Sequence, residues 1–82
     1  MKHYVVMFDW ATDEDSNTEI LGVVHTLEEA KSLLNQRLVQ EIMFAEKHDY
    51  KIETNTDTEF VAYEDGFYSG EHTHLWIEEV EN

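Results

Sequence analysis

One long amphipathic segment inside an otherwise β-rich chain is the feature that most constrains the fold. Thr26 followed three residues later by Glu29 forms a capping box, in which each side chain bonds the backbone amide of the other residue. Apolar residues then recur at spacings of three and four, which draws one stripe along a helix. The stripe consists of Leu27, Ala30, Leu33, Leu34, Leu38, Ile42 and Ala45, widened by Val39 and Met43. Because Lys47 suits the cation-favouring last turn, the sequence predicts a helix over residues 27–48.

Short segments rich in β-branched and aromatic residues flank this helix and predict strands. They cover residues 2–10, 19–25, 50–54, 58–63 and 72–80. Both faces of the first segment are largely apolar, which is typical of a central strand with cover on each side. The sequence therefore predicts a single α+β domain over residues 1–82, in the order ββαβββ, with one long amphipathic helix on a mostly antiparallel four- to five-stranded sheet.

Two polar stretches are expected to be exposed loops. Residues 11–18, ATDEDSNT, consist mostly of side chains that bond their own backbone in turns. Residues 64–71, EDGFYSGE, contain two of the three glycines and favour a hairpin loop.

The run from Ile20 to Ala30, ILGVVHTLEEA, forms a strand that enters a capped helix. It resembles a pattern in many small uncharacterised bacterial and phage proteins with a strand-strand-helix-strand layout. The resemblance covers the first half of the chain, and it implies a fold and no activity.

Composition excludes several classes of function. The chain has 82 residues and no cysteine, so it offers no disulfide, no thiolate zinc site and no cysteine nucleophile. The apolar run at residues 4–8 is far shorter than a signal-peptide core and is followed at once by Asp9, so we expect a cytoplasmic protein. Because the chain also lacks a nucleophile motif and a glycine-rich phosphate loop, we expect no enzyme, no catalytic residue and no cofactor.

The charge is strongly negative and unevenly distributed. Lys and Arg number 5 against 19 Asp and Glu, for a formal net charge of −14. Residues 9–19 contribute −5 and those after Lys51 contribute −9, whereas the predicted helix carries only −1. Phosphate backbones and anionic membranes attract basic residues, so we expect neither direct nucleic-acid binding nor membrane binding.

Acidic loops and strand edges suggest a protein partner with a basic surface. The charge of the chain corresponds to that of a short DNA duplex, which raises the hypothesis of a DNA-mimic inhibitor or regulator of a nucleic-acid-binding protein, encoded by a phage or mobile element. The candidate partner-binding residues are Asp13, Glu14, Asp15, Glu59, Glu64 and Asp65. The alternative interpretation of the acidity is solubility alone.

Two rival functions remain open at this point. One is a structural or regulatory homodimer whose interface is a second apolar sheet face around Trp10 and Trp76. The other is a metal-binding module that uses His72 and His74, which alternate on one face of the last strand. Two imidazoles from one strand are a common coincidence, and no metal site is expected from them alone.

Overall fold

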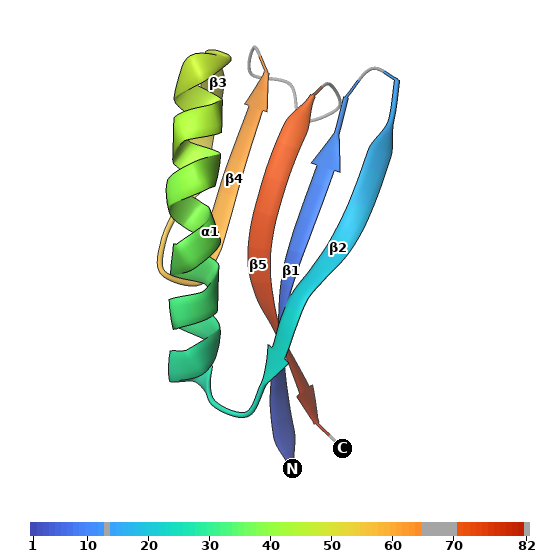
Figure 1. Cartoon of the computed structure of the whole chain (residues 1–82), viewed down its shortest axis with the longest axis vertical. Coiled ribbons are helices and arrows are strands. Elements are labelled where there is room, and N and C mark those ends of the chain that lie inside the picture. Colours follow the sequence, from blue (N-terminus) through green and yellow to red (C-terminus); the bar gives the residue numbers. More distant parts are fainter. Residues whose placement is uncertain (13, 65–70, 82) are drawn as a thin grey trace.

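The computed structural model describes residues 1–12, 14–64 and 71–81, and in this part of the chain one helix packs against one five-stranded sheet (Figure 1). The elements are β1 (Lys2–Ala11), β2 (Ser16–Val24), α1 (Leu27–Lys47), β3 (Tyr50–Asn55), β4 (Glu59–Glu64) and β5 (His72–Glu81). Their order across the sheet is β2-β1-β5-β4-β3, and every neighbouring pair is antiparallel. The predicted α+β class and the ββαβββ order are confirmed.

The two ends of the chain meet at the centre of the sheet, where β1 pairs with β5 along ten residues. On its other side β1 pairs with β2, and the pairing runs to the turn, where Ala11 lies opposite Ser16. Residues 16–18 were predicted as loop. They join the strand because the first hairpin is tighter than the polar composition of this stretch suggested.

The predicted capping residues start α1, with the Glu29 carboxylate bonded to the hydroxyl of Thr26 where its amide was expected. The Thr26 hydroxyl accepts a hydrogen bond from the amide of Glu29 at 3.1 Å, and it donates one to the Glu29 carboxylate at 3.0 Å. The helix ends at Lys47, and Asp49 follows with φ of 57°. A left-handed residue just past the end of a helix is a common termination, and aspartate tolerates it better than most residues.

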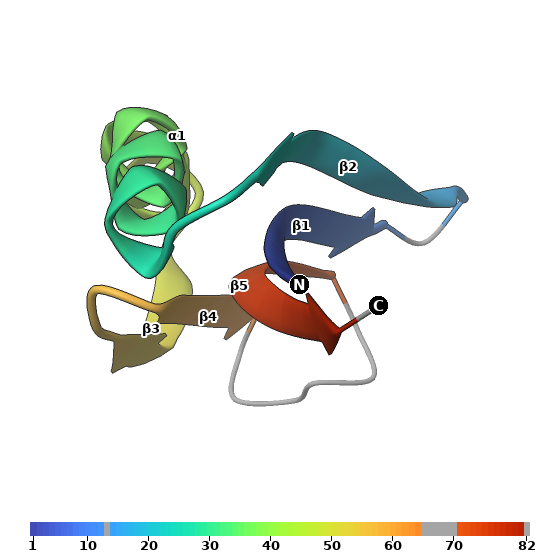
Figure 2. The same cartoon turned by 90° about the horizontal axis from the view of Figure 1, so that it is seen from below.

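The sheet curves around α1, which contacts all five strands (Figure 2). The core between the two layers contains these buried residues: Val6, Phe8, Ala30, Leu34, Ala45, Phe60, Ala62 and Leu75. At Gly22 the β2 backbone comes so close to α1 that an added Cβ would lie 2.5 Å from Cδ2 of Leu33. The glycine therefore permits the close approach of β2 to the helix.

The helix buries a narrower stripe than the sequence predicted. Val39 and Met43 are 61% and 66% exposed, so they lie outside the stripe that they were expected to widen. Glu41 is buried instead, and it accepts a hydrogen bond from Nε of Arg37 at 2.9 Å. No helix in the described part of the chain is long and apolar enough to cross a membrane.

Candidate functional site

The sheet face opposite α1, here called the outer face, carries exposed apolar side chains. Strand register places Ile20, Met7 and Trp76 in one row across β2, β1 and β5. Val23 and Val5 form the adjacent row. Ile20 and Val23 are 64% and 58% exposed. We call these five residues the outer patch, and contiguous exposed apolar surface of this kind marks interaction sites.

Trp76 lies in the outer patch and is held by both of its neighbours along β5. Its ring stacks on His74 with centroids 4.3 Å apart, and its Nε1 donates to the Glu78 carboxylate at 3.1 Å. Nε2 of His74 lies in turn 2.8 Å from Oε2 of Glu59 on β4. Tryptophan held in one orientation loses little entropy on binding, which suits it to anchor an interface.

Three carboxylates border the outer patch. Glu59 and Glu78 flank Trp76, and Asp9 lies two residues beyond Met7 on the same face of β1. Asp9 accepts a hydrogen bond from the Thr18 hydroxyl at 3.0 Å, and its other oxygen lies 3.2 Å from Nε2 of His72. The outer face therefore combines an apolar centre with negative groups whose positions are fixed by hydrogen bonds.

The two tryptophans do not share a face. Trp10 alternates with Phe8 on the side of β1 that meets α1, and it packs against the core. Trp76 lies opposite Met7, whose side chain points to the outer face. The predicted face around both tryptophans is therefore corrected to one around Trp76 alone. Both faces of β1 are apolar, so the sequence did not indicate which face the helix would cover.

His72 and His74 project from the same outer face, as alternation along β5 predicts. Each is directed at a different carboxylate, His72 at Asp9 on β1 and His74 at Glu59 on β4. Among the described residues no group of three His, Asp or Glu side chains is arranged to hold a metal ion.

The predicted acidic residues separate into two locations. Glu14 and Asp15 lie in the β1–β2 turn and Glu64 ends β4, which places all three at the end of the sheet where α1 terminates (Figure 1). Glu59 lies five residues back along β4, about 16 Å away at the usual rise of a strand. Asp13 and Asp65 lie outside the described residues.

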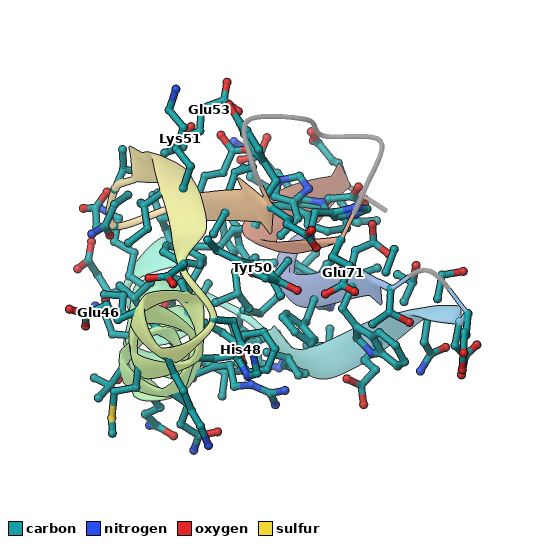
Figure 3. The ribbon with its side chains drawn as sticks, turned by 90° about the horizontal axis from the view of Figure 1, so that it is seen from above. Glu46, His48, Tyr50, Lys51, Glu53 and Glu71 are labelled. Carbon is teal, nitrogen blue, oxygen red and sulfur yellow. The ribbon has the colours of Figure 1, made fainter. Side chains whose placement is uncertain are left out.

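Tyr50 and Glu71 form a contact at this same end that sequence reasoning did not anticipate. The Tyr50 hydroxyl donates to the Glu71 carboxylate at 2.7 Å, which links the start of β3 to the residue before β5. In Figure 3 the two side chains point toward each other between α1 and the sheet, whereas Lys51 and Glu53 point away from the helix. The two residues are 21 positions apart, so no local pattern signals their contact.

No family model matches the chain, and no curated protein and no solved structure matches it.

Proposed function

We propose that this chain is a small acidic interaction protein that binds a basic, nucleic-acid-binding protein through its outer face. The observation that carries the proposal is Trp76, half-buried and oriented by His74 and Glu78 inside an apolar patch that three carboxylates border. Interfaces concentrate binding energy in such central aromatic residues and place charge at the rim.

The distribution of positive charge supports a basic partner. Three of the five basic residues lie on α1, on the far side of the sheet. Lys31 pairs with Asp57 at 3.2 Å and Arg37 with Glu41 at 2.9 Å. The helix carries −1 of the net charge of −14, so the strands and turns carry −13. A surface of this kind attracts a basic protein and repels another acidic one.

The length of the molecule allows its charge density to be compared with that of duplex DNA. The longest axis of the molecule is 40 Å, so 14 net charges amount to about one per 3 Å. Duplex DNA carries about one charge per 1.7 Å, roughly twice that density. We therefore propose that the chain competes with nucleic acid for part of the partner's nucleic-acid-binding surface. The apolar contacts of the outer patch add affinity that a phosphate backbone does not offer.

We assign different kinetic roles to the outer patch and to the acidic end of the sheet. Trp76 and its neighbours form the contact, so Trp76→Ala is expected to speed dissociation. The acidic end at Glu14, Asp15 and Glu64 steers the approach, so its reversal to lysine is expected to slow association and reduce the dependence on salt.

The test is affinity capture from lysate of the source cells, followed by kinetics on the purified partner. The bait is the whole chain, and the matched control is Glu28→Lys, an exposed acid in the first turn of α1. We expect a basic protein that the wild type and the control retain, that Trp76→Ala loses, and that added duplex DNA displaces. Equal capture by wild type and Trp76→Ala would contradict the proposal.

A homodimer through the outer patch is the second candidate, because Ile20 and Val23 are so exposed on edge strand β2. Self-association brings two charges of −14 together, so it should strengthen as salt screens them. Sedimentation equilibrium at low and high salt tests this candidate. A monomer under both conditions, at concentrations of tens of micromolar, would exclude it.

A further inference from the structure

A pocket of about 350 Å³ opens between α1 and the sheet, on the opposite side of the sheet from the outer patch. Its lining comes from β1, α1, β5 and the residue after β1, namely Phe8, Trp10, Thr12, Arg37, Glu41, Phe44 and Thr73. Phe8 and Thr73 are buried, whereas Phe44 is 39% exposed, so the pocket runs from the core to the surface. Pockets of this size accommodate small molecules.

Three aromatic rings form the apolar walls. Phe8 and Trp10 project from the same face of β1, and Phe44 comes from the last turns of α1. The Phe44 and Tyr50 rings are perpendicular with centroids 5.5 Å apart, and Tyr50 supports Phe44 from outside the pocket lining. Aromatic walls favour a flat apolar molecule that can stack on or contact their rings.

Thr73 supplies a buried polar group that has no partner among the described residues. Its side chain is buried at 4% exposure, and within the described structure its Oγ1 makes no hydrogen bond. A buried hydroxyl without a partner costs about 1 to 3 kcal/mol, so such groups are rare unless something else satisfies them. Thr73 lines the pocket while its Oγ1 is itself covered, so a ligand can bond this hydroxyl once rotation about χ1 turns it toward the pocket.

Glu41 and Arg37 bring opposite charges to the same wall. Nε of Arg37 donates to Oε2 of Glu41 at 2.9 Å, and the guanidinium lies over the Phe8 ring, 4.5 Å from its centroid. The two charges offset each other inside the pocket. The net charge of −14 on the whole chain then disfavours an anion.

We propose that this pocket binds a small, flat, uncharged aromatic molecule with a polar group that hydrogen-bonds to the Thr73 hydroxyl. A cavity of about 150 Å³ holds benzene, so the larger volume here suits a molecule of two fused rings. A second pocket, about 240 Å³ beside Leu21, Leu33 and Arg37, shows no buried side-chain atom without a partner among its described lining residues and carries no proposal.

The two tryptophans provide a built-in test of location. Trp10 lines the pocket, and Trp76 lies on the outer face, so their indole N–H resonances report on opposite sides of the sheet. We would titrate the whole ¹⁵N-labelled chain with 2-naphthol to millimolar concentration and assign the two signals with Trp76→Phe. Binding that shifts the Trp10 signal and leaves the Trp76 signal in place is the expected result. No shift of Trp10, or a shift of Trp76 alone, would overturn the proposal.

Substitution of the hydroxyl tests the polar contact. Thr73→Val keeps the shape of the side chain and should weaken 2-naphthol binding about three- to tenfold, the usual range for one hydrogen bond. Thr54→Val on β3 is the matched control, and it should bind as the wild type does. An unchanged affinity in Thr73→Val would overturn the assignment of this hydroxyl. The anionic probe 2-naphthoate should bind more weakly than 2-naphthol, and equal affinity would overturn the assignment of an uncharged ligand.

Discussion

Both faces of the sheet carry apolar side chains, and along β2, β1 and β5 those of one face are buried whereas those of the other stay partly or largely exposed. On the inner face, Val6, Phe60 and Leu75 are fully buried beneath α1. On the outer face, Ile20, Met7 and Trp76 remain partly or largely exposed, and carboxylate–histidine pairs surround them. The comparison shows that apolar composition makes a face eligible for burial, whereas the single helix decides which face forms the core.

The largest expected difference between the faces is in packing energy. Phe60→Ala empties a fully buried site and should lower the free energy of unfolding by about 3 to 5 kcal/mol. Ile20→Ala on the outer face should change it by less than about 0.5 kcal/mol, because the side chain is already in water. Urea unfolding of the two variants measures both values. Similar losses would mean that the outer patch is covered in solution, as in the dimer candidate.

The second largest difference in stability is expected between an ion pair on α1, Arg37 with Glu41, and an ion pair on the outer face, His74 with Glu59. Arg37→Leu leaves the buried carboxylate of Glu41 without its partner, with an expected cost of about 2 to 3 kcal/mol. His74→Gln alters the more exposed pair with Glu59 and should cost about 0.5 kcal/mol or less. The double variant Arg37→Leu, Glu41→Met should recover most of the loss, because it removes the buried charge together with its partner. Failure to recover would assign the cost to packing of the arginine stem.

A smaller effect of opposite sign is expected at Thr73. Thr73→Val replaces a buried hydroxyl that has no partner in the described part of the chain by a methyl group of the same shape, so it should raise the free energy of unfolding by about 1 kcal/mol. Thr54→Val, on the edge strand β3, should change stability less. A destabilised Thr73→Val would show that the hydroxyl is satisfied in solution.

Repulsion among the negative charges should have the smallest effect on stability. Added sodium chloride screens the −14 net charge and should raise the melting temperature by a few degrees, as should a mild fall in pH toward 6. The charge-reduced variant Glu14→Gln, Asp15→Asn, Glu64→Gln should respond less to salt, which differential scanning calorimetry can measure. An equal response would place the dominant repulsion elsewhere in the molecule.

Local patterns were enough to predict the elements of this fold. The capping residues Thr26 and Glu29 and the three-four spacing located α1, because a helix start and a buried helix face depend on neighbouring residues. The order of β and α segments then limited the architecture to one helix on a mostly antiparallel sheet. Prediction failed for Val39 and Met43, whose hydrophobicity fits the stripe but whose positions on α1 turn them away from the sheet and leave them 61% and 66% exposed.

The sequence by itself determined where the helix and most strands form, and how the negative charge divides between helix and strands. Only the tertiary structure decided that Trp10 belongs to the core and Trp76 to the outer face, and that Thr73, Arg37 and Glu41 share one pocket. Helix starts and strand alternation are local properties of neighbouring residues. The face that α1 covers depends instead on pairing between strands as distant in sequence as β1 and β5, which no short segment of the chain can encode.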